Sequence, residues 1–298
     1  MAAIHRRNRV KTAEARLFIR PVGREKKRKS QNFHKSFTFH TNNGCKLGRV
    51  GKSGCLLSES GKGMVIFMDY RHEWKFEISE TDLLILRQRL RAVARPDPHA
   101  VCGKYVIRSL YFDNAADRAL REKLDGVSRR EKFRIRYYND DTSFIRLEKK
   151  SKAGGLGKKQ SAPLTAMQTL DIVNGCTDWM AGSKEELICE LYSKMRTQGL
   201  RPKIIVDYIR EPFVFAPGKI SDIAPGNVRV TLDYNIRTGF NCRDFLKPDC
   251  VTIPAGDAPV ILEVKWDSFL PDIIRDAVTL PGRRAAAFSK YAQCRIYG

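Results

Sequence analysis

Charged side chains alternate with mostly apolar ones in five short segments of the chain. The segments are Arg71-x-Glu73-x-Lys75, Lys132-x-Arg134-x-Arg136, Arg146-x-Glu148-x-Lys150, Tyr208-x-Arg210 and Glu263-x-Lys265. Successive side chains of a β-strand point to opposite faces, so each segment would gather its charges on one face. One such strand is typical of a solvent-exposed sheet. Five of them, mostly cationic with glutamates between, predict charged faces that line a common cavity for a polyanion.

Cations that converge in a cavity need a compensating charge. Two like charges ~5 Å apart repel by ~3 kcal/mol at an effective dielectric of ~20. A chain of phosphates would supply the compensation, because Arg offers a planar fork to phosphate oxygens and Lys a movable point charge. The glutamates have a second use, since carboxylate oxygens suit Mg²⁺ or Mn²⁺ and such ions bridge phosphates during phosphoryl transfer.

The net charge supports an anionic ligand without identifying it. The 298 residues carry a formal charge of +22, from 55 Lys and Arg against 33 Asp and Glu. Residues 1–63 hold 16 basic and 3 acidic residues and so contribute +13, while residues 64–298 contribute +9. More than half of the excess therefore lies in the first fifth of the chain, which weakens the argument from overall basicity to nucleic acid. We expect no specific nucleic-acid partner.

Residues 1–63 are predicted to be a disordered basic extension, followed by a folded domain over residues 64–298. The extension combines basic runs with scattered Gly and Ser and has no hydrophobic periodicity. It could be a polybasic arm for nucleic acid or an anionic membrane, or a segment without a function. Translation from an upstream start is a further alternative, because Met64 and Met68 precede the first clear strand.

The chain is expected to be cytoplasmic, at most peripheral to the inner face of a membrane. No window approaches 18 consecutive apolar residues, so we expect no membrane span. The N-terminus lacks the apolar stretch of a secretory signal. Eight cysteines form no CxxC pair, which is typical of reduced thiols.

Eight strands are expected to position the charged segments, with helices inserted between them. Hydrophobic periodicity and turn residues predict strands at 71–78, 104–112, 132–138, 144–150, from about 157, and at 203–210, 227–234 and 260–266. Helices are expected after caps at Ser79 and Asn114, and at 165–175, 183–199, 270–280 and 284–293, the fourth of these capped by Ser183. A turn at residues 139–141 would join the third and fourth strands into a hairpin.

The faces opposite the charges are apolar, with residues such as Trp74, Phe133, Val230 and Val264. Helices could cover these faces from outside while the charged faces point inward. A sandwich would instead bury the apolar faces against each other and leave the charges in solvent. The predicted fold is therefore α+β, an eight-stranded antiparallel β-barrel with helices packed around the outside.

The charged segments also carry a resemblance to a known family. From about Tyr70 to the C-terminus the chain resembles the VTC domain, the polyphosphate polymerase domain of the triphosphate tunnel metalloenzyme superfamily. The segments that carry it are RHEWKF (71–76), IRSLYFDN (107–114), REKLDG (121–126), REKFRIRYY (130–138), RLEKKSK (146–152), RPKIIVDYIRE (201–211), NVRVTLDYNIRTG (227–239), ILEVKWDSFLP (261–271) and FSKYAQCR (288–295).

The resemblance implies an antiparallel tunnel that binds ATP and inorganic polyphosphate and uses Mn²⁺ or Mg²⁺ in phosphoryl transfer. It implies roles in catalysis for Lys75, Arg134, Arg136, Arg210, Lys265 and Lys290. It implies substrate binding by Lys150, Tyr208, Ser289 and Arg108, and metal binding by Glu263 and Glu148. Glu73, Glu148 and Asp233 are weaker candidates, and Glu73 and Glu148 could instead pair with neighbouring cations. Arg108 shares a strand face with Leu110 and Phe112, so it could lie outside the tunnel.

Two departures from the family bear on the reaction. Relatives that make polyphosphate at a eukaryotic vacuole also carry an SPX domain and membrane spans, and neither is found here, so export of the product would need a separate membrane protein. Related triphosphate hydrolases begin with a Glu-x-Glu-x-Lys strand, whereas this chain has Arg71-x-Glu73-x-Lys75. Replacing a metal-binding carboxylate by a cation favours a polymerase over a hydrolase.

Three functions remain open from the sequence. A polymerase would transfer the terminal phosphoryl group of ATP to a growing polyphosphate chain, and water in place of the chain would make the same site a triphosphatase. A binding module could hold polyphosphate or RNA without chemistry. Glu263 favours an enzyme, because a pure anion binder has no need of a carboxylate among cations.

Overall fold

The computed structural model describes residues 72–154, 156–215, 228–257, 259–267 and 269–297. All of them belong to one compact unit, Asp69–Gly298. The predicted basic extension, residues 1–63, and Arg71 lie outside the described residues. No helix of the described residues is long and apolar enough to cross a membrane.

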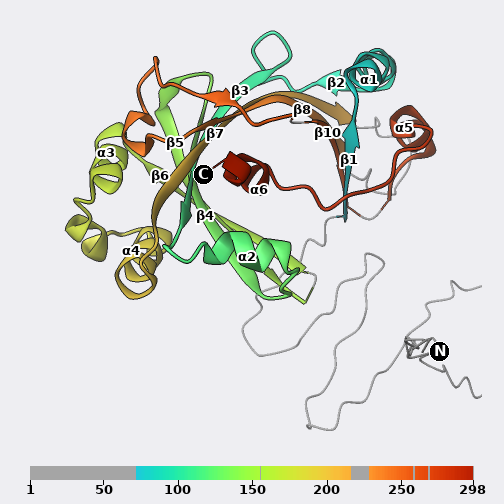
Figure 1. Ribbon diagram of the computed structural model, residues 1–298. Helices are drawn as coiled ribbons and strands as arrows, with labels where there is room; N and C mark the ends of the chain where they lie inside the picture. The colour runs from blue at the N-terminus through green and yellow to red at the C-terminus, as the bar shows by residue number, and fades with distance from the viewer. Residues whose placement is uncertain (1–71, 155, 216–227, 258, 268, 298) are drawn as a thin grey trace, which may run out of the picture. The chain divides into compact units, whose positions relative to one another are not determined.

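One antiparallel sheet forms the centre of the protein (Figure 1). Eight strands follow one another across it in the order β1-β10-β8-β7-β3-β4-β5-β6, while β2 pairs with β7 and β9 with β8. The strands are β1 (His72–Ile78), β2 (Arg95–Pro96), β3 (Tyr105–Asp113), β4 (Arg130–Tyr138), β5 (Asp141–Ala153), β6 (Leu156–Leu164), β7 (Arg201–Phe215), β8 (Val228–Gly239), β9 (Ile253–Pro254) and β10 (Val260–Trp266).

The sheet is strongly curved and open on one side. Its strands bend around α6 (Lys290–Cys294), which lies on the concave side (Figure 1). Within the described residues no pairing joins the two edge strands, β1 and β6. The predicted α+β class and antiparallel tunnel architecture are confirmed, with the difference that the hydrogen-bonded ring is not closed between these two edges.

Register places the charged residues of neighbouring strands on the same face. In β4 and β5, Arg134 lies opposite Glu148, and in β1 and β10, Lys75 lies opposite Glu263. Side chains directly opposite each other share a face of the sheet. The alternation seen in the sequence therefore becomes a concave charged face and a convex apolar face.

Helices cover the convex face on both halves of the sheet. On one half, α1 (Glu80–Val93) and α5 (Asp272–Val278) pack on β1, β10 and β8, and Leu86 and Leu90 of α1 are fully buried there. On the other half, α3 (Ala166–Asn174) and α4 (Glu186–Gln198) cover β3 to β6. Full burial of a side chain such as Leu90 contributes ~1.5–3 kcal/mol, so these helices hold the curvature of the sheet.

A third apolar cluster lies on the concave side and fills one end of the curve. Tyr291 and Cys294 of α6 pack there against Ile107, Tyr208 and Ile261 of the inner face. The rest of the concave face remains available to the charged residues. The C-terminal segment thus closes one part of the inner space and brings Lys290 into it.

Local sequence signals explain most of the element boundaries. Ser79 caps α1 in a capping box with Asp82, and Thr165 caps α3 in the same way. The expected hairpin between β4 and β5 turns at Asn139 and Asp140, which both have positive φ, a conformation that Asn and Asp tolerate better than most residues.

Three helix predictions were wrong in extent. The helix expected from Ser183 begins at Glu186, because residues 178–182 form a short 3₁₀ turn and the Ser183 hydroxyl accepts a hydrogen bond from the Glu185 backbone instead. The helix expected over 284–293 is only α6, because Ala285 forms a β-bridge with Phe76. The Asn114 side chain caps a turn, and the short helix that follows, α2 (Arg118–Leu124), begins four residues later.

Candidate functional site

The concave face encloses a cavity of about 600 Å³. Residues of β1, β4, β5, β6 and β10 line it, together with Ala119 and Lys123, residues 285–289 and Tyr291. Both edge strands contribute, Lys75 from β1 and Lys159 from β6, so the unpaired seam of the sheet borders this cavity. The cavity is therefore a tunnel-like space with a wall made of charged strand faces.

Glu263 lies at the centre of one ion-pair cluster in this space. Its carboxylate is 3.3 Å from Nζ of Lys75, 3.1 Å from Nζ of Lys265 and 3.4 Å from Nη2 of Arg210. Glu73 shares the same two lysines, at 2.9 Å from Lys75 and 3.6 Å from Lys265. The cluster follows from register, since each lysine stands opposite a glutamate on the neighbouring strand. Burial opposes ionisation of Glu263, but a hydrogen bond with Glu73 and the charge of Lys265 hold its pKa well below the ordinary value.

Asp233 forms ion pairs with two cations, Arg210 and Lys290. It is fully buried, and its two oxygens accept bonds from Arg210 at 2.6 and 2.7 Å. Nζ of Lys290 donates to the same carboxylate at 2.6 Å. Burial opposes ionisation, yet Arg210 and Lys290 lower the pKa of Asp233. The Tyr208 ring lies beside both cations, 5.5 Å from the Arg210 guanidinium and 4.7 Å from Nζ of Lys290.

Arg134 and Arg136 of β4 extend the cationic wall. Arg134 donates to one oxygen of Glu148 at 2.7 and 2.5 Å, and Lys159 reaches the other oxygen at 2.5 Å. Arg136 is held by hydroxyl groups, at 2.8 Å from Ser109 and 3.0 Å from Tyr208. Burial opposes ionisation of Glu148, but Arg134 and Arg136 hold its pKa far below the ordinary value. Arg136 is thus a buried cation that acts on Glu148 through its charge but forms no direct ion pair with a carboxylate among the described residues.

Lys132 and Lys150 are also without a carboxylate partner among the described residues. They stand opposite each other on β4 and β5, and both line the cavity. Burial, only partly offset by Tyr111, lowers the pKa of Lys132 to about 8. Burial and the nearby cations Arg134 and Lys265 lower the pKa of Lys150 to about 6. These lysines would gain most from an anion in the cavity.

Tyr111 is a member of the site that the sequence did not identify. It is buried, stacks on Tyr291 at 5.2 Å between ring centroids, and its hydroxyl accepts a hydrogen bond from Arg134 at 3.1 Å. Burial alone would raise its pKa, but Arg134 and Lys132 lower it to about 7. A tyrosine in a strand is usually a core residue, so only its position opposite Arg134 in the register reveals this role.

The structure brings most of the predicted site residues together. Lys75, Lys150, Lys265 and Ser289 line the cavity, and Ser289 also caps α6 by accepting a hydrogen bond from the Ala292 backbone. The ion pairs and hydrogen bonds above link the following residues on the same concave face: Arg134, Arg136, Glu148, Tyr208, Arg210, Glu263 and Lys290.

Arg108 is not part of this group. It lies on the convex face, where it pairs with Asp207 at 2.9 Å and donates to the Lys247 carbonyl at 2.9 Å. Its neighbour Ser109 points to the concave face and contacts Arg136. The alternative seen in the sequence, that Arg108 lies outside the tunnel, is the arrangement found, and we leave it out of the proposed substrate contacts.

Glu263 is the carboxylate that best fits a divalent metal. Its cation contacts are 3.1–3.4 Å long, whereas Glu148 and Asp233 are held at 2.5–2.7 Å. The described residues contain no group of three His, Cys, Asp or Glu arranged to hold a metal. Mg²⁺ and similar ions are often bound through one or two carboxylates, with substrate phosphates and water as the other ligands. Glu263, with Glu73 beside it, fits that kind of site, and Glu148 fits it less well.

Three solved structures show limited similarity to the chain. A putative adenylyl cyclase from Hippeastrum, described as having a dominant triphosphatase activity, is 13% identical with a TM-score of 0.44, covering 76% of this chain and 96% of its own. A putative adenylate cyclase from Bacillus halodurans is 12% identical with a TM-score of 0.37 over 69% and 83% of the two chains. One from Vibrio parahaemolyticus is 8% identical with a TM-score of 0.34 over 70% and 82%.

A family model gives the assignment. No curated protein matches the chain significantly. The model of the VTC domain matches residues 70–296, which include every strand and helix described above. The match agrees with the resemblance carried by the charged strands. The chain therefore belongs to the VTC domain family.

Proposed function

We propose that this protein is a polyphosphate polymerase that transfers the terminal phosphoryl group of ATP to a growing phosphate chain. The observation that carries the proposal is the charge of the cavity, whose lining holds nine Lys and Arg against two Glu. Five of these lysines form no ion pair with a carboxylate among the described residues: Lys123, Lys132, Lys150, Lys152 and Lys158. A linear polyanion of phosphates is the ligand that neutralises such a wall along its length.

The proposed contacts fall into two groups on the charged face, one around Glu263 and one along β4 and β5. Arg210, Lys265 and Lys75 surround Glu263 and would hold the triphosphate of ATP near the metal position. Lys290 and Ser289 would contact it from the C-terminal segment, with Tyr208 between them and β4. Arg134, Arg136 and Lys150 would hold the acceptor chain.

The transfer itself requires positioning and charge neutralisation rather than a protein nucleophile. A terminal oxygen of the acceptor chain is already ionised and forms the new bond to the γ-phosphorus. The bond between that phosphorus and the β–γ bridging oxygen breaks, and ADP leaves with the electron pair. The Arg210 and Lys75 side chains would stabilise the charge that gathers on the bridging oxygen and on the transferred group.

A divalent ion at Glu263, Mn²⁺ or Mg²⁺, would supply Lewis-acid neutralisation of the phosphate oxygens. Glu73 would be the second protein carboxylate at that position, since both glutamates share Lys75 and Lys265. Lysines that are drawn away from these carboxylates by phosphate would leave the oxygens free for the metal. The longer cation contacts of Glu263 would make this exchange of lysine for metal easier than at Glu148, so we prefer Glu263 as the metal ligand.

The test is product analysis with the full-length protein. It would be incubated with γ-labelled ATP and Mn²⁺, with and without a short polyphosphate primer, and the products resolved on a gel. A ladder of labelled chains that is lost in Glu263→Gln supports the polymerase. Free phosphate alone would make the protein a triphosphatase, and bound ATP without either product would make it a binding module.

A further inference from the structure

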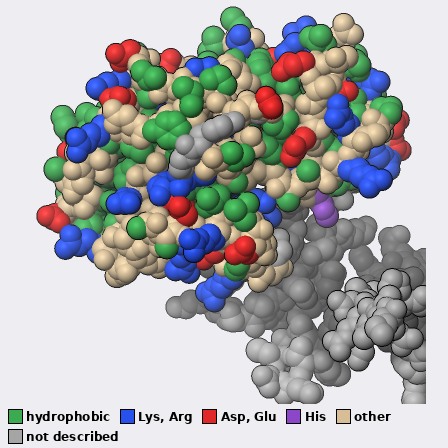
Figure 2. All heavy atoms as spheres, in the orientation of Figure 1, with side chains coloured by type: hydrophobic (Ala, Val, Ile, Leu, Met, Phe, Trp, Pro, Cys, Tyr) green, Lys and Arg blue, Asp and Glu red, His purple; other side chains and the backbone are tan. Residues whose placement is uncertain are grey.

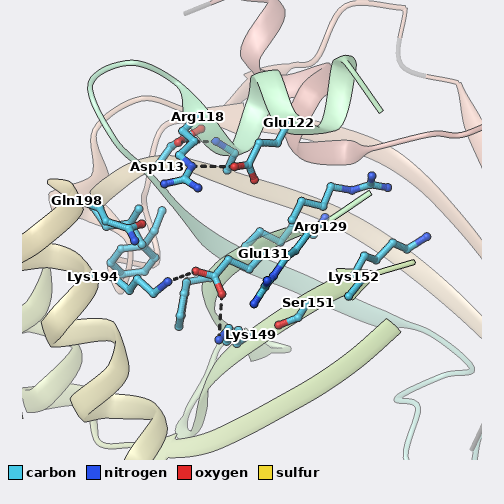
Figure 3. A pocket seen from close by; sticks show the side chains of 17 residues that line it. Asp113, Arg118, Glu122, Arg129, Glu131, Lys149, Ser151, Lys152, Lys194 and Gln198 are labelled. Carbon is cyan, nitrogen blue, oxygen red and sulfur yellow. Dashed lines mark hydrogen bonds and ion pairs between the residues drawn. The ribbon is translucent and has the colours of Figure 1, made fainter. Parts of the chain in front are cut away.

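A second cavity, of about 420 Å³, lies outside the curved sheet (Figure 3). It is formed between α2 and α4, at the end of β3 and beside the adjoining ends of β4 and β5. The residues predicted from the sequence to bind substrate or metal do not belong to its lining, whereas Lys132 of the tunnel wall does. The proposed phosphoryl transfer therefore gives this cavity no role.

The outer cavity adjoins the tunnel cavity. Six residues line both of them: Ala119, Arg130, Glu131, Lys132, Ser151 and Lys152. Lys132 lies on the same strand face as Arg134 and belongs to the inner charged wall. A chain that leaves the tunnel past the paired ends of β4 and β5 would thus meet the shared lining residues, most of them charged, before it reaches the outer cavity.

The outer cavity has more cations than its carboxylates neutralise. Seven Lys and Arg line it, against three Asp and Glu. Glu131 is occupied by Lys149 and Lys194, and Glu122 by Arg118. Figure 2 shows basic side chains gathered over α2 with acidic ones beside them.

Two of the remaining cations are exposed and have no carboxylate partner among the described residues. They are Arg129 and Lys152, and Figure 3 shows Lys152 extending away from the Glu131 ion pairs. Within the part of the chain that the structure describes, Arg130 donates only to the Val127 carbonyl, at 2.5 Å. Asp113, the third acid, is fully buried and accepts hydrogen bonds from the Ala119 backbone and the Tyr291 hydroxyl, and it forms no ion pair with these cations among the described residues.

We propose that the outer cavity is a second phosphate-binding site, which holds the part of a polyphosphate chain that extends beyond the tunnel. The proposal rests on the proposed function only for the identity of the anion. Its ligand class is a short run of phosphate groups, recognised by the Arg129 and Arg130 guanidinium groups and by Lys152. A free short phosphate anion would satisfy the same chemistry.

The lining argues against single-stranded nucleic acid as the ligand. Such ligands bind through bases stacked on exposed aromatic rings as well as through a basic groove. The only aromatic residues of the outer lining, Phe112 and Phe133, are 1% exposed and belong to the convex core. A simple surface ion-pair network is disfavoured as well, because such a network would balance its charges.

Charge reversal at Arg129 tests the proposal, since this residue lines the outer cavity and not the tunnel. Binding of tripolyphosphate and of long-chain polyphosphate to the full-length protein would be measured by calorimetry in moderate salt. We expect Arg129→Glu to weaken long-chain binding about tenfold, which corresponds to ~1.4 kcal/mol, and to leave tripolyphosphate binding in the tunnel unchanged. Arg129→Lys should keep most of the long-chain affinity.

Arg243→Glu is the matched control, because Arg243 is exposed and lines neither cavity. If Arg129→Glu instead removes a second, weaker tripolyphosphate site, the outer site exists but takes a free anion. Equal long-chain binding by wild type and Arg129→Glu, or an equal loss in Arg243→Glu, overturns the proposal. Product analysis of the same proteins separates the proposed polymerase activity from the proposed second site. A protein that makes no polymer can still lose long-chain affinity in Arg129→Glu, and an active polymerase can keep it.

Discussion

Asp233 offers the sharpest test of the charge balance in the tunnel. The substitution Asp233→Asn keeps the shape of the side chain and removes its charge, so Arg210 and Lys290 lose the anion that they share at 2.6–2.7 Å. Removing one partner of a buried ion pair costs ~3–5 kcal/mol, and the remaining amide oxygen favours the lower end of that range. In a protein of this size ~3 kcal/mol corresponds to a fall of about 6–12 °C in Tm.

The same substitution should make phosphate a stronger stabiliser. A ligand at 100 times its Kd stabilises the folded state by ~2.7 kcal/mol, and each tenfold gain in affinity adds ~1.4 kcal/mol. Because Arg210 and Lys290 are freed for the ligand, tripolyphosphate should raise the Tm of Asp233→Asn more than that of the wild type. Thermal unfolding with and without tripolyphosphate measures both effects.

Asp207→Asn is the matched control for this experiment. Asp207 is also buried and pairs with an arginine, Arg108, but it lies on the convex face. The Asp207→Asn variant should be less stable than the wild type, and tripolyphosphate should raise its Tm by no more than it raises the Tm of the wild type. The reasoning is refuted if the ligand shifts the Tm of both variants by the same amount, or if Asp233→Asn is as stable as the wild type.

Three further predictions concern individual charges. Phosphate should raise the pKa of Lys132 from about 8, because the charged lysine binds the anion better than the neutral one. Calorimetry should therefore show that tripolyphosphate affinity falls between about pH 7 and about pH 9, as the free protein loses this proton. Lys132→Arg, which stays charged, should flatten this pH dependence. The lowered pKa of Glu148 means that its contribution to stability is present above its ordinary value of 4.5 and is lost as the pH falls toward its folded-state pKa. Urea unfolding of Glu148→Gln should therefore show a weaker loss of stability in acid than the wild type does, and an equal loss would contradict the assignment. Arg108→Met should lower Tm without changing tripolyphosphate affinity, whereas Arg136→Met should weaken that affinity by at least about tenfold, the loss of one charged hydrogen-bonding partner. Similar affinities for these two variants would remove Arg136 from the site.

Alternation along the strands was sufficient to predict which face would be charged. A period of two fixes the face of every residue once one of them is placed, which is why Lys75, Arg134, Arg210 and Glu263 could be grouped without coordinates. The same rule set Arg108 on the face of Leu110, and the structure follows it. The expectation that Arg108 contacts substrate came from the resemblance and conflicts with this alternation.

Features that depend on register or on distant segments were beyond prediction. Tyr111 enters the site because it stands opposite Arg134, and that pairing cannot be derived from either strand alone. The alanines at 285–287 have high helix propensity, yet the Ala286 backbone donates to the Lys75 carbonyl at 2.8 Å and the segment runs beside β1. A tertiary hydrogen bond with a strand residue 211 positions earlier in the chain overrides the local preference.

The distribution of carboxylates within the tunnel suggests how a phosphate chain would bind. Asp233 and Glu148 hold their cations at short distances, so phosphates would have to compete with fixed negative charges there. Lys132 and Lys150 have no such competitor, and their lowered pKa values mean that part of their charge is absent until an anion arrives. A phosphate beside them would favour their charged form and raise their pKa values, because it offsets the repulsion between neighbouring cations. The acceptor chain should therefore bind most tightly along β4 and β5, on the side of the tunnel that borders the outer cavity.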